Sequence, residues 1–244
     1  MPLGRRGARA LASRFVYEVG TVVGQYPSLA LPVARWRRHG EPFGSDTDVV
    51  IEGYPRSANN FAVAAFASAQ PGPVRIAHHV HAPAHAIEAV RRGLPTLVLI
   101  REPEYAVVEL VLLKSALTLH QALRGWIRFY RPLVPYRRRF VVARTEEVLA
   151  DFGVVIGRLN ERFGTSFGEV VGSEDAVRAA ERGIGHHREG REGPGLPFIG
   201  RTRETEEGRK ADRERLRREY RSVRLAALRD RAGRLHETFT NAAR

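Results

Sequence analysis

The stretch that decides the fold lies at residues 48–61 and reads DVVIEGYPRSANNF. Its first half, Asp48–Tyr54, is a short β-branched run of the kind that forms a buried strand. A turn follows at residues 55–57, and the alanine-rich segment Ala58–Ala69 predicts a helix packed closely against a sheet. The order strand, tight turn, helix is typical of the start of an α/β unit.

Two further apolar runs predict strands, at Leu94–Ile100 and Arg139–Arg144, and a helical pattern follows each. Strands separated by helices indicate an α/β fold with a central parallel sheet flanked by helices. Ligands of such sheets bind at the carboxyl ends of the strands, where Tyr54–Asn60 and Arg101–Glu109 fall. We therefore expect a binding site at that edge of the sheet.

The length of 244 residues predicts a single domain. We divide it into a basic N-terminal segment at 1–45, a core at 46–203 and a charged C-terminal helix at 204–244. In the last part, Glu206–Phe239 predicts one long helix whose charges form a solvated face.

The amino-acid composition excludes some kinds of site and bears on the kinds of partner. The chain has no cysteine, which excludes disulfides, thiolate metal sites and a cysteine nucleophile. A net charge of +13 implies affinity for polyanions, but Lys114 and Lys210 are the only lysines, and an arginine bias can also reflect genome composition. The charge therefore gives little support to a nucleic-acid partner. The N-terminal apolar stretch is too interrupted to span a membrane, so we expect a cytoplasmic protein whose basic N-terminus is able to contact a membrane surface.

The turn after the first strand has the properties of an anion site. A turn that opens a helix presents unpaired backbone N–H groups at the positive end of the helix dipole. Arg56 would neutralise a phosphate oxygen, while Ser57, Asn59 and Asn60 would add donors. The sequence has no G-x-x-x-x-G-K-[ST] motif, so magnesium is not implied. The purely structural alternative is a helix N-cap, where Ser and Asn are also favoured.

Residues 54–61, YPRSANNF, resemble the first signature of the 3′-phosphoadenosine 5′-phosphosulfate (PAPS)-dependent sulfotransferases, approximately Tyr-Pro-Lys-Ser-Gly-Thr-Thr-Trp. The resemblance implies a three-layer sandwich like that of the P-loop nucleotide hydrolases, with a nucleotide-binding core at 46–203. It also implies that Phe61 lies near the adenine and that the 5′-phosphosulfate is held by Arg56, Ser57, Ala58, Asn59 and Asn60. Among the departures from the family pattern, Ala58 replaces a glycine and Asn60 replaces a threonine.

A second segment, IREP at residues 100–103, resembles the Arg-Asn-Pro signature of the same family. The resemblance implies that Arg101 grips the 3′-phosphate. The family's partner serine falls at Glu109, a carboxylate that should repel a phosphate, so Arg201 and Arg203 would assist Arg101. A surface salt bridge of Arg101 with Glu102 or Glu104 is the structural alternative.

Between the two signatures, His81-Ala82-Pro83 resembles the His-x-Pro setting of the catalytic base in cytosolic sulfotransferases. The resemblance implies that His81 takes the proton from the acceptor, since imidazole titrates near neutrality, while Arg56 stabilises the departing phosphate oxygen. His78 and His79 raise the alternative of a metal site. Strand alternation would send His78 to the opposite face from His79 and His81, so we rank a base first, a structural histidine second and a metal ligand third.

These observations predict a sulfotransferase that moves the sulfuryl group of PAPS, without a metal, to a hydroxyl or amine of a small-molecule, glycan or lipid acceptor. One rival is a nucleotide-dependent phosphotransferase of the same fold, which needs magnesium ligands and a loop lysine. Another is a degenerate, non-catalytic basic protein that binds nucleic acid or an anionic surface. Three departures from the family pattern favour this last possibility: Glu109, Ala58, and Thr145, which replaces a family tyrosine beside the adenine.

Overall fold

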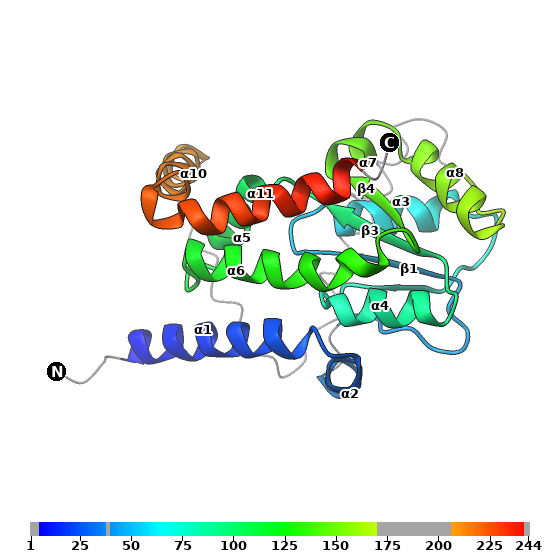
Figure 1. Ribbon diagram of the computed structural model, residues 1–244, viewed down its shortest axis with the longest axis horizontal. Helices are drawn as coiled ribbons and strands as arrows, with labels where there is room; N and C mark the ends of the chain where they lie inside the picture. Colours follow the sequence, from blue (N-terminus) through cyan, green and yellow to red (C-terminus); the bar gives the residue numbers. More distant parts are fainter. Residues whose placement is uncertain (1–4, 38–39, 170–205, 242–244) are drawn as a thin grey trace.

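The computed structural model describes residues 5–37, 40–169 and 206–241 (Figure 1). The strands in these ranges are β1 (Val49–Gly53), β2 (Ile76–His78), β3 (Thr96–Ile100) and β4 (Val141–Arg144). The helices before β4 are α1 (Arg5–Val23), α2 (Pro27–Arg37), α3 (Asn59–Ala69), α4 (Pro83–Arg91), α5 (Pro103–Leu113), α6 (Leu119–Tyr130) and the 3-10 helix η1 (Arg131–Tyr136). After β4 come α7 (Thr145–Ala150), α8 (Phe152–Phe163), α10 (Glu206–Tyr220), the 3-10 helix η2 (Val223–Leu225) and α11 (Ala226–Thr240).

The strands form one parallel sheet in the order β2-β1-β3-β4. In the register of the sheet, Val50 of β1 lies between Ala77 of β2 and Thr96 of β3. Every residue of β1 and β3 is buried, which explains why their sequences are almost continuous apolar runs rather than alternating ones. The prediction of an α/β fold with a central parallel sheet is confirmed.

Helices cover both faces of this sheet (Figure 1). On one face, Ile51 and Leu99 pack with residues of α3 and α8. On the other face, Val98 and Ile100 pack with residues of α4, α5, α6 and α11. The protein is thus a three-layer helix–sheet–helix sandwich, and its two largest hydrophobic clusters among the described residues lie on either side of the sheet.

The C-terminal segment differs from the single helix predicted for Glu206–Phe239. α10 ends at Tyr220, and Ser222 then adopts an extended backbone with φ −65° and ψ 157°. Arg229 closes the end of α10, because its Nη1 donates to the carbonyl oxygen of Tyr220 at 2.8 Å and to that of Ser222 at 3.2 Å. Val223 is 91% exposed in this break. Two helices therefore replace the predicted one.

The N-terminal segment forms two helices on the outside of the sandwich. α1 lies along α6, and α2 packs on α4 (Figure 1). α2 begins at Pro27, whose fixed φ suits the first position of a helix. In the part of the chain that the structure describes, none of the helices has the length and apolar character needed to cross a bilayer.

Candidate functional site

The turn after β1 has a left-handed backbone at two residues that are not glycine. The angle φ is 73° at Arg56 and 63° at Ala58, while Ser57 between them is not left-handed. The N–H of Ser57 between them closes the turn by donating to the carbonyl oxygen of Tyr54 at 3.2 Å, so the N–H groups offered to an anion are those at the start of the following helix. Asn59 and Asn60 then open α3 at the positive end of its dipole. The backbone at the start of α3 therefore fits an anionic group such as a phosphate.

The side chains of this turn are packed tightly. A Cβ atom at Gly53 would lie 2.8 Å from the carbonyl oxygen of Leu99 and 2.9 Å from Oδ1 of Asn59, so only glycine fits there. Asn59 is buried and donates from Nδ2 to the carbonyl oxygen of Tyr54 at 3.1 Å. Ser57 is also buried, and its Oγ has no hydrogen bond of ordinary length within the described ranges, although it lies beside the Tyr130 hydroxyl and acts to lower the pKa of that phenol. To donate to a bound anion, Ser57 would have to turn its hydroxyl away from Tyr130.

The left-handed backbone at residue 58 predicts the effect of restoring a glycine. Ala58→Gly should raise the free energy of unfolding by about 0.5–1 kcal/mol, because relief of the strain exceeds the added freedom of the unfolded chain. Urea denaturation measures this. Ala67→Gly, at an exposed position inside α3, should lower the same free energy by about 0.5–1 kcal/mol. Equal destabilisation by both changes would contradict a left-handed residue 58.

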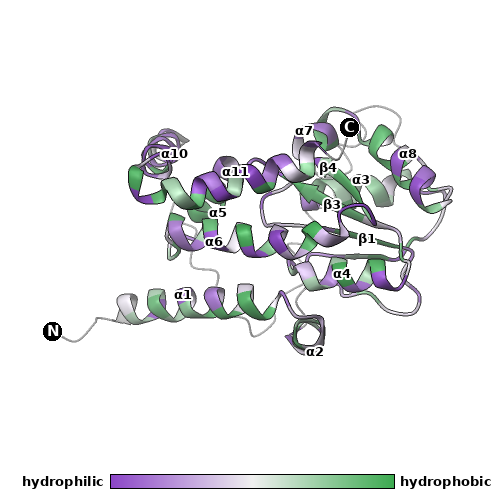
Figure 2. Cartoon of the chain, in the orientation of Figure 1, coloured by the Kyte–Doolittle hydropathy of each residue, from purple (hydrophilic) through white to green (hydrophobic). Residues whose placement is uncertain are grey.

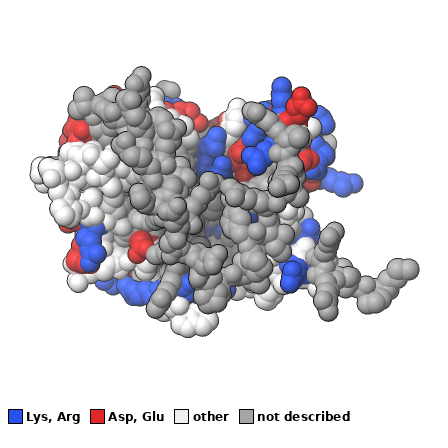
Figure 3. Space-filling model, turned by 180° about the vertical axis from the view of Figure 1, so that it is seen from behind, with Lys and Arg blue, Asp and Glu red and all other residues white. Residues whose placement is uncertain are grey.

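Arg56 stands at the exposed lip of the turn, where its Nη2 lies 4.0 Å from Oε2 of Glu109. Oε1 of Glu109 accepts a hydrogen bond of 2.7 Å from Nε of Arg213 in α10. The carboxylate at the family's serine position is therefore flanked by two guanidinium groups, which balance its charge. Figure 3 shows acidic and basic side chains mixed over α10. An anion bound in the turn would compete with Glu109 for Arg56.

Arg101 follows β3 and reaches the same turn. Its Nη1 donates to the backbone carbonyl oxygen of Arg56 at 3.1 Å. The structural alternative, a salt bridge with Glu102 or Glu104, does not occur among the described residues, and Glu104 is paired with Arg221 at 2.9 Å. The side chain of Arg101 is thus held beside the turn.

The loop between β2 and α4 brings His81 to the other side of the turn. Nδ1 of His81 lies 2.8 Å from the carbonyl oxygen of Gly53. Because a carbonyl oxygen only accepts, Nδ1 carries the proton and Nε2 is the basic nitrogen of the neutral ring. In the same loop, Nε2 of His79 contacts Oδ1 of Asn60. The loop therefore meets both the end of β1 and the start of α3.

The predicted alternation of the histidines is wrong. β2 ends at His78, and the left-handed φ angles of 59° at His79 and 52° at His81 belong to a loop. The ring centroids of His78 and His79 are 4.7 Å apart, and those of His79 and His81 are 5.4 Å apart. The three rings thus form one row instead of lying on opposite faces. Within residues 5–37, 40–169 and 206–241, no group of three or more His, Cys, Asp or Glu side chains is placed to hold a metal ion.

Glu52, a fully buried residue of β1, holds this loop in place. Its Oε1 accepts from the N–H of Val80 at 2.8 Å, and its Oε2 accepts from the N–H of His81 at 3.1 Å. Nδ1 of His85 lies 2.9 Å from Oε1. The N–H of Phe43 donates to Nε2 of His85 at 3.1 Å, so the proton of this imidazole is on Nδ1 and points at Glu52.

The hydrogen bonds decide the charge of Glu52. Burial acts to raise the pKa of the carboxyl, but the hydrogen bond and charge of His85, the charge of His81 and the bond from Val80 together outweigh burial and hold the pKa below its ordinary value of 4.5. Glu52 is therefore a buried carboxylate that stays ionised at neutral pH. The sequence contains one signal for it, a single acidic residue inside an otherwise apolar strand.

The remaining predicted site residues are placed as follows. Phe61 is partly buried and packs edge-on against Phe152 of α8, with ring centroids 6.5 Å apart. Arg201 and Arg203 lie outside the described residues. Arg101 contacts the backbone of Arg56, and His81 contacts that of Gly53, both near the carboxyl end of β1. Neither a search against protein-family models nor one against curated proteins finds a match to this chain.

Proposed function

We propose that this protein is a sulfotransferase that moves the sulfuryl group of PAPS to a hydroxyl or amine of an acceptor. One set of observations carries the proposal: a turn with a left-handed backbone at Arg56 and Ala58, the side chain of Arg101 and an imidazole with a fixed Nδ1–H lie at the carboxyl edge of a parallel sheet. Arg101 contacts the turn at Arg56, and His81 contacts it at Gly53. Open α/β sheets bind ligands at this edge.

The residues of the turn suit the donor. When bound, PAPS supplies a sulfuryl group on a phosphate that can leave. The N–H groups at the start of α3 and the hydroxyl of Ser57, turned away from Tyr130, would hold the phosphosulfate, and Arg101 would hold the 3′-phosphate. The family resemblance adds Arg201 and Arg203 to this second role.

His81 would act as the base. Its Nδ1–H is fixed on Gly53, so Nε2 takes the proton of the acceptor hydroxyl while the acceptor oxygen forms its bond to sulfur. Arg56 would stabilise the negative charge on the departing phosphate oxygen. In this scheme the protein contributes positioning and charge stabilisation.

Binding of adenosine 3′,5′-bisphosphate, the desulfated product, tests the proposal. Calorimetric titration should give a dissociation constant on the order of micromolar, with much weaker binding of ATP. Arg101→Ala should weaken binding of the bisphosphate by about 10- to 100-fold, because a hydrogen bond from a charged donor contributes about 1.5–3 kcal/mol.

The control is Arg75→Ala. Arg75 is also exposed, but it precedes β2 and so lies at the amino edge of the sheet, where it pairs with Asp46. Its removal subtracts the same charge and should leave affinity unchanged. An absence of bisphosphate binding would favour the degenerate, non-catalytic reading. The contact between Glu109 and Arg56 supports that reading, because it occupies the cation that the turn needs.

A further inference from the structure

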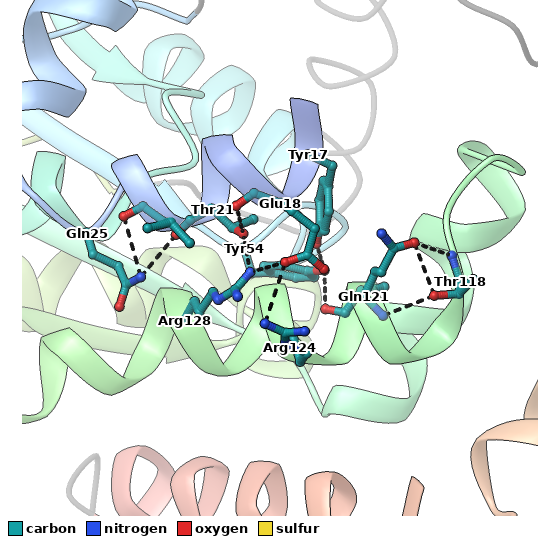
Figure 4. A network of polar contacts seen from close by, with 11 residues as sticks. Tyr17, Glu18, Thr21, Gln25, Tyr54, Thr118, Gln121, Arg124 and Arg128 are labelled. Atoms are coloured by element: carbon teal, nitrogen blue, oxygen red, sulfur yellow. Dashed lines mark hydrogen bonds and ion pairs between the residues drawn. The ribbon is translucent and has the colours of Figure 1, made fainter. Parts of the chain in front are cut away.

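The inner face of α1 is polar. Nε of Arg14 donates to the carbonyl oxygen of Ala116 at 2.6 Å, and the hydroxyls of Tyr17 and Tyr54 are 2.8 Å apart. Glu18 pairs with Arg128 of α6, which also donates to Oγ1 of Thr21. Figure 4 shows Tyr17, Glu18 and Thr21 pointing from α1 toward α6. Hydrogen bonds and ion pairs, more than apolar burial, therefore hold α1 on the protein.

The outer face of α1 is apolar. Its exposed large hydrophobic side chains recur every three or four residues and so share one side of the helix; they include Leu11, Phe15, Val19 and Val22. Phe15 is 70% exposed. Figure 2 shows hydrophobic residues along the whole of α1. α1 thus reverses the usual arrangement of a surface helix, whose apolar side faces the core.

The apolar surface continues through the turn into α2. The exposed apolar side chains here are again three or four residues apart, and they are Tyr26, Leu29, Val33 and Trp36. Trp36 is 82% exposed. We call the exposed apolar residues of both helices the α1–α2 face. Exposed apolar side chains gathered on neighbouring helices in this way mark an interaction site.

The positive charge of residues 1–45 indicates what kind of partner the α1–α2 face would bind. In residues 1–45, arginines outnumber carboxylates by seven to two. One of the two carboxylates, Glu18, is neutralised by Arg128 and by Arg124 at 3.8 Å. Arg9, Arg35 and Arg37 are exposed. An apolar helical face with Phe and Trp, bordered by unopposed arginines, is the composition of helices that lie in the interface of anionic membranes.

A groove beside α1 adds a second observation. It has a volume of about 330 Å³, and its lining consists of Phe15, Glu18, Val19, Val22, Val23 and Arg128. Its walls are largely apolar, and the two charged side chains in its lining, Glu18 and Arg128, are paired with each other. Such a groove matches an acyl chain, while the acidic headgroup would meet the exposed arginines Arg9, Arg35 and Arg37.

We propose that the α1–α2 face docks the protein onto a membrane surface that carries anionic lipids, with both helices lying in the interface. A second copy of the chain fits the face less well. A two-fold dimer would place the same surface on both sides of the contact, and the arginine-rich helices would then repel each other. The inference does not depend on the proposed sulfuryl transfer.

Co-sedimentation with lipid vesicles tests the docking. The full chain should bind vesicles of equimolar phosphatidylglycerol and phosphatidylcholine, and binding should weaken as salt is added. Phe15→Glu combined with Trp36→Glu should lower the partition coefficient at least about a hundredfold, because each buried aromatic ring contributes strongly to partitioning. Both side chains point outward, so circular dichroism should confirm that the variant is folded.

The matched control is Val154→Glu combined with Val223→Glu. These two residues are 61% and 91% exposed, lie away from the α1–α2 face, and add the same charge; this variant should bind like the wild type. Equal vesicle binding by wild type and the Phe15, Trp36 variant would overturn the proposal. The proposal would also be overturned if the wild type did not bind vesicles but formed a dimer in sedimentation equilibrium without lipid, and if the Phe15, Trp36 variant did not form that dimer.

Discussion

The His81→Ala variant is expected to release adenosine 3′,5′-bisphosphate from PAPS about 100- to 10,000-fold more slowly than the wild type. The reason is the loss of the imidazole whose Nδ1–H is fixed on the carbonyl oxygen of Gly53 and whose Nε2 is thereby the basic nitrogen. Chromatographic assay of the bisphosphate, with a panel of sugar, phenol and lipid acceptors, measures the rate. The affinity for the bisphosphate should stay within a few-fold of the wild type.

The left-handed backbone of residue 81 calls for a second variant. His81 has a φ of 52°, a conformation that asparagine adopts more readily than alanine. His81→Asn should keep the loop and still lose turnover, because an amide cannot serve as a base. His120→Ala, which removes an exposed imidazole from α6, should leave the rate unchanged. Near-normal turnover in His81→Asn would remove His81 from the mechanism.

Glu52→Ala is expected to lower the free energy of unfolding by about 3–5 kcal/mol, the largest loss of stability that we predict. The change leaves three buried donors without an acceptor: the N–H groups of Val80 and His81, and Nδ1–H of His85. Urea denaturation at neutral pH measures the loss. Glu88→Gln, which removes a partly exposed ion pair with Arg92, should cost less than about 1 kcal/mol.

The depressed pKa of Glu52 gives this stability a pH dependence. A carboxyl whose pKa is lower in the folded state stabilises the protein at pH values above its unfolded pKa, near 4.5. That contribution is lost as the pH falls through the lower, folded pKa. Unfolding curves of the wild type should therefore lose stability below about pH 4.5 more steeply than those of Glu52→Gln. Parallel acid curves for the two proteins would show that Glu52 is not the responsible group.

The sheet was predictable from the sequence because its signals are local. β1 and β3 are short apolar runs followed by turn residues, and Gly53 marks the point where β1 must pass close to β3. The parallel arrangement then placed Arg56 and Arg101 at one edge of the sheet. These inferences need only periodicity and the handedness of α/β connections.

The features that the sequence analysis predicted wrongly depend on contacts between residues far apart in the chain. The break after Tyr220 depends on Arg229 reaching back to the carbonyl groups of α10, and no periodicity reveals that contact. The row formed by His78, His79 and His81 depends on a loop whose shape is set by Glu52, 28 residues before Val80. A propensity scale assigns such a loop to the preceding strand.

The pairing of Glu109 with Arg213 could not be predicted from the sequence for a related reason. Arg213 belongs to a segment whose alternating charges match a solvated helix, yet α10 packs on α5 and joins the two side chains. Tertiary packing therefore decides which of the many arginines in this chain stand near the turn, and composition alone does not distinguish them.

The buried carboxylate of Glu52 also bears on the order in which the protein folds. Its donors lie 28 to 33 residues away along the chain, in the loop after β2 and in α4. Until those segments pack against β1, the carboxylate of Glu52 must remain hydrated, so the face of β1 beside it cannot be buried. Non-local contacts of this kind form slowly. We therefore expect the loop that carries His81 to take its final shape together with the closure of α4 over β1, because both supply donors to Glu52.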